Sequence, residues 1–195
     1  MSKIALRAVV LGAVVALLGI ASYAVAGGGG KHHLKPVTLM GYQENPDIST
    51  TATGTFEARI ADDDQSISYT LSYSGLEGDV QQSHIHFGKP ALNGGISVWL
   101  CKTSGFPGPV GNHLPTCSVL PEQRSGEVTG VIHPDDVIGP ATQGIEAGAF
   151  AELLAAIRAG HAYANIHSTK WPGGEIRAQI SGKGDKGDKG DKGDD

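Results

Sequence analysis

Short segments in which apolar and polar residues alternate constrain the fold of this chain most strongly. Between residues 66 and 74, apolar or aromatic side chains occupy every second position: Ile67, Tyr69, Leu71 and Tyr73. Successive side chains of a β-strand point to opposite faces, so this period of two predicts a strand with one face toward a core. Residues 53–61 alternate in the same way, and the acidic triplet 62–64 between the two segments predicts a hairpin turn.

Composition favours the same fold class. The 195 residues include 29 Gly and 10 Pro, which indicates many turns, while only 18% are charged. That balance suits an all-β domain with short strands better than a helical bundle. Residues 146–159 are the exception, because their apolar side chains recur at helical spacing and predict one amphipathic helix packed on the core. These side chains are Phe150, Leu153, Leu154 and Ile157.

The start of the chain has the pattern of an export signal. Lys3 and Arg7 precede an apolar run over residues 8–21, and Ala24-Val25-Ala26 has the small-x-small pattern of a cleavage site. We therefore expect a signal peptide at 1–26, with an uncleaved membrane anchor as the alternative. The product would be secreted, periplasmic or attached to the cell surface, without a stable membrane anchor after cleavage. A flexible Gly/His leader is expected at 27–35.

The other end of the chain is a low-complexity segment. From residue 182 to 195 the sequence consists of Lys-Gly-Asp repeats with Gly at every third position, as collagen requires. The run is short and contains no Pro, which favours a disordered, charge-balanced tail over a triple helix. The β domain is therefore expected at 36–181.

Charge restricts the classes of partner. The formal net charge is −5, and it becomes −7 once Lys3 and Arg7 are removed with the signal. An acidic exported protein without a basic cluster is a poor candidate for binding nucleic acid or an anionic membrane.

The chain has two cysteines, Cys101 and Cys117, which flank a segment rich in Gly and Pro. In an oxidising compartment one disulfide is the economical interpretation, and it would staple an insert at 101–117. The alternative is a pair of thiolate metal ligands, although the spacing does not match a zinc knuckle.

Three histidines form the candidate site. His84 and His86 are two positions apart in a predicted strand, so both point to one face. A later predicted strand, which ends at His167, places Tyr163, Asn165 and His167 on one face. If the two strands are neighbours, the three imidazoles can converge on one metal ion at bonds of about 2 Å. The alternative is that these histidines are surface or hydrogen-bonded residues.

Four further residues could orient the histidines: Asn165, Glu175, Arg177 and Glu44. The first three lie on or beside the predicted hairpin that contains His167. Glu44 belongs to the predicted turn at 44–47, where a solvated carboxylate is the alternative interpretation.

Several motifs lie along the predicted domain: Gly41-Tyr42-Gln43-Glu44-Asn45-Pro46, Thr53-Gly54-Thr55-Phe56, Ser74-Gly75-Leu76, Ser83-His84-Ile85-His86-Phe87-Gly88, Ala162-Tyr163-Ala164-Asn165-Ile166-His167 and Pro172-Gly173-Gly174-Glu175-Ile176-Arg177-Ala178-Gln179. Together they resemble the CHRD family, which is named after repeats in the animal protein chordin and is also found in exported microbial proteins. The resemblance covers about residues 37–180 and departs from the common form in the long insert around the cysteines. It implies an exported, β-sandwich-like domain, so we expect an antiparallel β-sandwich or flattened barrel with one short helix. It implies no particular reaction.

Three functions fit these observations. The first is an exported metal-binding module that holds copper or zinc through His84, His86 and His167. The second is an extracellular module that binds a protein or a glycan without metal. The third is a metal-dependent redox enzyme. The sequence shows no Ser or Cys nucleophile motif and no nucleotide-binding loop, so it favours no hydrolase or nucleotide-dependent enzyme and leans away from catalysis.

Overall fold

The computed structural model describes residues 33–109, 113–117 and 124–180. The predicted signal peptide, most of the predicted leader and the predicted Lys-Gly-Asp tail lie outside these described residues. The last leader residues lie on the domain: Leu34 is buried, and its amide donates a hydrogen bond to the carbonyl of Ala58. No helix in the described part of the chain is long and apolar enough to cross a membrane.

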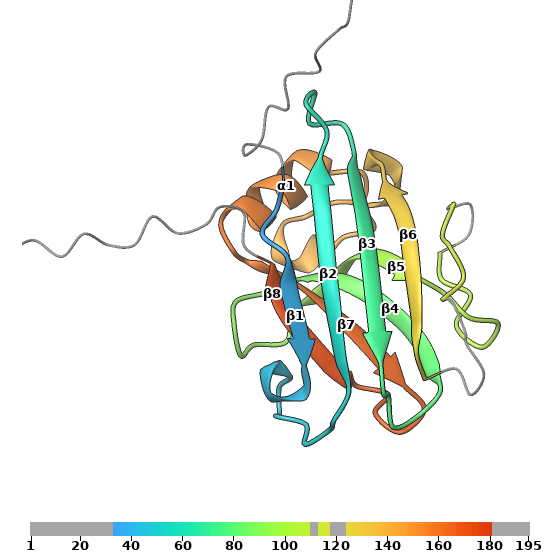
Figure 1. Cartoon of the computed structure of the whole chain (residues 1–195). Helices are drawn as coiled ribbons and strands as arrows, with labels where there is room; N and C mark the ends of the chain where they lie inside the picture. The colour runs from blue at the N-terminus through green and yellow to red at the C-terminus, as the bar shows by residue number, and fades with distance from the viewer. Residues whose placement is uncertain (1–32, 110–112, 118–123, 181–195) are drawn as a thin grey trace, which may run out of the picture.

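Within these described residues, eight antiparallel strands form one sheet, with the order β5-β4-β7-β8-β1-β2-β3-β6. The strands are β1 Val37–Met40, β2 Thr53–Ile60, β3 Ile67–Ser74, β4 Val80–Phe87, β5 Gly95–Cys101, β6 Gly126–Ile132, β7 Ala162–Ser168 and β8 Ile176–Ile180. Short 3₁₀ helices are η1 Gly41–Gln43, η2 Pro134–Asp136 and η3 Ala141–Gln143. The sheet curls until its edge strands, β5 and β6, approach each other (Figure 1). A hydrogen bond from the Tyr69 hydroxyl to the Leu100 carbonyl links β3 to β5. The expected all-β class is confirmed, in the form of a nearly closed, flattened barrel.

The interior of the barrel is apolar and follows the predicted alternation. In β3 the side chains at every second position are buried, and the β2 side chains Phe56, Ala58 and Ile60 join them in the same core. At about 25 cal/mol per Å² of apolar surface removed from water, this interior is the main source of stability.

The helix α1 spans Phe150–Arg158 and is shorter than the predicted 146–159. Gly148 has a φ of +79°, a left-handed conformation that interrupts a right-handed helix, so regular helix begins only after it. The predicted apolar stripe is confirmed as part of the core, because all four of its side chains are buried there. Gly160, with a φ of +70°, ends the helix and directs the chain into β7.

Strand β7 differs from the others because both of its faces are covered. All seven of its residues are buried. Ala162, Ala164 and Ile166 face the apolar core. The intervening side chains, Tyr163 and Asn165 among them, therefore lie on the outer face of the barrel and are covered by loops. This enclosed polar layer contains the predicted site.

Candidate metal centre

Strands β4 and β7 are neighbours in the sheet, as the proximity of the histidines requires. In their antiparallel register His84 is opposite Asn165, and Gln82 is opposite His167. His84 thus lies beside the half of β7 that carries His167, and His86 is opposite Tyr163, near the start of the strand. All three rings are enclosed, with His84 only 1% exposed, His86 8% and His167 7%.

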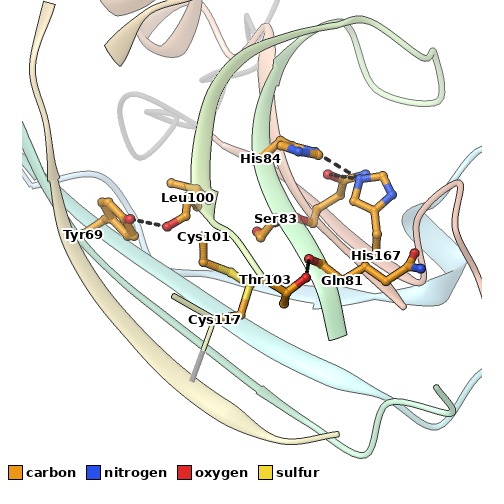
Figure 2. Close-up of a disulfide and its surroundings, with 10 residues drawn as sticks. Tyr69, Gln81, Ser83, His84, Leu100, Cys101, Thr103, Cys117 and His167 are labelled. Carbon is orange, nitrogen blue, oxygen red and sulfur yellow. Dashed lines mark hydrogen bonds between the residues drawn. A yellow bond between two sulfur atoms is a disulfide. The ribbon is translucent and has the colours of Figure 1, made fainter. Parts of the chain in front are cut away.

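The three imidazoles form one cluster. The Nδ1 atom of His84 lies 3.2 Å from Nε2 of His167, as Figure 2 shows, and ring centroids are 5.0 to 6.4 Å apart. One nitrogen from each ring lies within 4.8 Å of the other two. Two ligands bound to one ion at about 2.1 Å cannot be more than about 4.2 Å apart, so shared coordination requires a shift of about 1 Å or less per ring. Small rotations of the side chains provide such a shift.

Backbone carbonyls fix the protonation pattern of two rings. Nδ1–H of His86 donates to the Gly94 carbonyl, and Nδ1–H of His167 donates to the Pro172 carbonyl, each at 2.9 Å. In a neutral imidazole the other nitrogen then carries a lone pair. Both residues consequently present Nε2 as an acceptor, which is the pattern by which metal-binding histidines are oriented.

Unmet hydrogen-bonding capacity is concentrated in the same cluster. Within the described residues, Nε2 of His84 and Nε2 of His86 are buried and have no hydrogen-bond partner. The Nε2 atom of His167 faces two groups at 3.2 Å, Nδ1 of His84 and the side-chain amide of Asn165. Buried acceptors without donors are costly, and a cation bound among them would remove that cost.

Burial also keeps the histidines neutral. It lowers the pKa of His84 to about 2, with smaller contributions from the neighbouring His167 and His86. It lowers the pKa of His86 to about 4, partly opposed by the hydrogen bond to Gly94. The pKa of His167 is lowered by the same desolvation. Neutral imidazole is the form that binds metal ions.

Two aromatic rings enclose the cluster. The ring of Tyr163 stacks parallel to His86 with centroids 4.7 Å apart, and Trp99 of β5 meets His84 edge to face at 4.4 Å. Sequence reasoning placed Tyr163 on the face of His167 but assigned no role to it, and it did not connect Trp99 with the site. The available signal for Trp99 was strand alternation, which does not reveal that β5 pairs with β4.

The four residues expected to orient the ligands behave differently. Asn165 contacts His167 directly. Arg177 is separated from His86 by the ring of Tyr163, over which its guanidinium carbon lies at 3.3 Å from the centroid. Glu175 is buried but accepts hydrogen bonds from Thr50 and Ser168. Glu44 has no contact with the histidines in the described structure.

Glu44 is nevertheless enclosed, in contrast to the solvated carboxylate considered as an alternative. It is 6% exposed, and its Oε1 atom has no hydrogen-bond partner among the described residues. Burial raises its pKa to about 7, against the opposing effect of the Arg177 charge. It lines a cavity of about 120 Å³ that also includes Trp171 and Gly173.

The disulfide between Cys101 and Cys117 is confirmed, which removes both thiolates as metal ligands. Both cysteines are fully buried, and Cys101 is paired with Ser83 beside His84 (Figure 2). The disulfide therefore attaches the insert to β5, the strand that pairs with the histidine-bearing β4. Its Thr103 hydroxyl also donates a hydrogen bond to the Gln81 carbonyl of β4.

The chain was compared with known proteins in three ways. Searches of curated proteins and of solved structures found no match. The family model of the CHRD domain matches residues 36–180, which is most of the chain and contains all eight strands and the three histidines. The chain therefore belongs to the CHRD domain family.

Proposed function

We propose that this protein is an exported metal-binding module in which His84, His86 and His167 hold one copper or zinc ion. The observation that carries the proposal is the enclosed cluster itself, whose three ring nitrogens lie within 4.8 Å of one another. Imidazole nitrogen suits both copper and zinc. The location of the protein, secreted, periplasmic or on the cell surface, is part of the proposal and comes from the signal-like start of the sequence.

The geometry favours retention of an ion over catalysis on a substrate. Structural metal sites are closed, whereas catalytic sites keep a position open to substrate or water. Here the free Nε2 atoms of His84 and His86 are inaccessible to solvent, and aromatic rings cover them. A binding, storage or stabilising role follows from this enclosure more directly than a redox enzyme does.

The test is metal content and affinity in untagged protein. We expect about one equivalent of copper or zinc by elemental analysis, and His84→Ala or His167→Ala should each abolish most of it, since two imidazoles hold an ion far less tightly than three. The matched control is His113→Ala, which removes an exposed histidine of the insert. Equal metal content in wild type and His84→Ala would contradict the proposal.

A protein- or glycan-binding module is the second candidate, and exposed apolar side chains favour it. Tyr42 of η1 is 68% exposed, and Leu92 of the loop between β4 and β5 is 55% exposed. A hydrogen bond from the Asn93 side chain to the Asn45 carbonyl joins that loop to the segment that follows η1. This function predicts that no histidine substitution changes metal content, and that Tyr42→Ser weakens capture of an extracellular ligand.

A further inference from the structure

We propose that the three-histidine site selects the cuprous ion, Cu(I), over Zn(II) and Cu(II). The inference rests on the proposed metal-binding function and names the ion that the site is built for. Three features carry it: ligands without charge, an enclosure that leaves little room for a fourth ligand, and a buried cation one ring away.

The ligand set offers no negative charge to a bound ion. The three imidazoles are neutral, and the nearest further donor is the neutral amide oxygen of Asn165, 3.2 Å from His167 Nε2. The buried carboxylate of Glu175 is engaged with Thr50, Ser168 and the amide of Glu77. The cost of burying an ion rises steeply with its charge, so a monovalent ion is favoured where no anion compensates a divalent one.

The enclosure matches three-coordination. Zn(II) bound by three histidines completes its tetrahedron with water, and Cu(II) prefers four tetragonal ligands. At this site Trp99 and Tyr163 pack against the histidine rings. The unpartnered Nε2 atoms of His84 and His86 are closed to a water-sized probe within the described structure. Zn(II) and Cu(I) both have filled d shells. Cu(I), which has the lower charge, is the one that three nitrogens in a plane satisfy without a fourth ligand.

Arg177 adds a positive potential. It is 1% exposed, and its donors go to uncharged groups, the carbonyls of Lys89 and Leu92 and the side-chain oxygen of Asn93. Among the described residues no carboxylate lies within ion-pair distance of it. Glu44 is the acid that faces it, and burial leaves that carboxyl only partly ionised at neutral pH.

This cation lies on the far side of Tyr163 from His86. The stack His86–Tyr163–Arg177 is held on one side by the 4.7 Å ring contact and on the other by the 3.3 Å guanidinium contact. One extra unit charge on the metal, at a separation of about 10 Å in a partly polar medium, costs roughly a factor of ten in affinity. Arg177 thereby disfavours both divalent ions relative to Cu(I).

The test compares three ions on the full chain. Affinity is measured by competition with a chromophoric chelator of known affinity, anaerobically for Cu(I) and in parallel titrations for Zn(II) and Cu(II). His84→Ala is run alongside, so that binding at other histidines is subtracted. We expect the His84-dependent site to bind Cu(I) about 100-fold or more tightly than Zn(II), given an uncompensated buried charge.

Arg177 variants test the electrostatic part. Arg177→Gln should lower the ratio of Cu(I) to Cu(II) affinity about tenfold, and Arg177→Lys, which keeps the charge, should leave it near the wild-type value. Glu44→Gln at pH 8 removes the facing negative charge and should raise the ratio, which keeps the test informative if Arg177→Gln does not fold. An unchanged ratio in the folded charge variants would overturn the role of Arg177.

The two proposals fail in different ways. If the His84-dependent site binds Zn(II) as tightly as Cu(I) or more tightly, the selectivity is refuted and the metal-binding function remains. If His84→Ala changes the affinity for none of the three ions, the metal-binding function itself is refuted.

Discussion

At the scale of single residues, the enclosed polar layer depends on side chains that are expensive to bury. Glu44, His84, His86, Asn165 and Arg177 are all less than one-tenth exposed. Polar groups are usually buried only when each finds a partner, and three of these five leave at least one atom without one among the described residues. Because burying such groups costs stability, a substitution that removes one of them should cost less stability than function.

Glu44 makes stability depend on pH in a predictable direction. Its pKa is raised from 4.5 to about 7 in the folded protein, so the folded state holds this proton more tightly than the unfolded state. The contribution of the Glu44 proton to the free energy of unfolding is fully present below pH 4.5 and is lost as pH rises through 7. Its size is up to about 3 kcal/mol. Glu44→Gln, which stays neutral, should become more stable relative to wild type across that interval.

Urea unfolding of both proteins between pH 4 and pH 8 measures this difference. Arg177 is the cation that faces Glu44, and Tyr163 lies beside the pair. An arginine is not deprotonated in proteins, and burial raises the pKa of Tyr163 above its ordinary value, so both groups contribute equally to the two proteins across this range. If the difference in free energy of unfolding between the two proteins does not change with pH, the Glu44 carboxyl is ionised equally in the folded and unfolded states.

At the scale of elements, two attachments complete the barrel: the disulfide joins the insert at 101–117 to β5, and α1 packs on the core. The helix presents its apolar side to the interior, and Leu153 is fully buried there. The insert is tied to the last residue of β5 by the disulfide.

Truncation of the helix contact should be costly. Leu153→Ala removes a fully buried side chain and leaves a cavity, so the free energy of unfolding should fall by about 2–5 kcal/mol. The neighbouring Glu152→Ala, on an exposed position of the same helix, should change it by less than about 0.5 kcal/mol. Chemical denaturation decides between these values, and equal effects of the two substitutions would mean that the helix does not pack as described.

Removal of the disulfide should weaken the edge of the barrel. A bridge across a sequence separation of 16 is worth about 3 kcal/mol in the chain-entropy model. Cys101→Ala combined with Cys117→Ala should lower stability by about that amount. Amide exchange should rise most in β5 and in the adjoining half of β4, because Cys101 is paired with Ser83. Exchange that rises only in the loop would contradict the close attachment of the insert to the site.

At the scale of the whole molecule, the described domain forms one sheet around one core, and the family match ends at residue 180 where β8 ends. A shortened chain of residues 33–180 should therefore fold by itself. Its melting temperature should lie within a few degrees of that of the chain that starts at residue 27 and ends at 195, because the additional segments carry few apolar residues for a core. A drop of ten degrees or more, measured by circular dichroism, would show that the end segments pack on the domain.

The sequence by itself determined the class of fold, the family and the identity of the three histidines. Alternation of apolar side chains is a local property, and it reports directly which face of each strand is buried, as in β3. Two residues apart on one strand, His84 and His86 had to share a face whatever the rest of the chain did. The disulfide was equally predictable, since only two cysteines are present.

Only the tertiary structure decided what surrounds those histidines. Strand order places β7 beside β4 and brings Trp99 against His84. The path of the loops places the carbonyls of Gly94 and Pro172 where they accept hydrogen bonds from the rings of His86 and His167. Strand order depends on contacts between residues far apart in the chain, and no local pattern encodes it. The length of α1 was misjudged for a related reason: the apolar stripe from Phe150 to Ile157 does not show where the helix begins, and the left-handed conformation of Gly148 is set by the turn it makes in the folded protein.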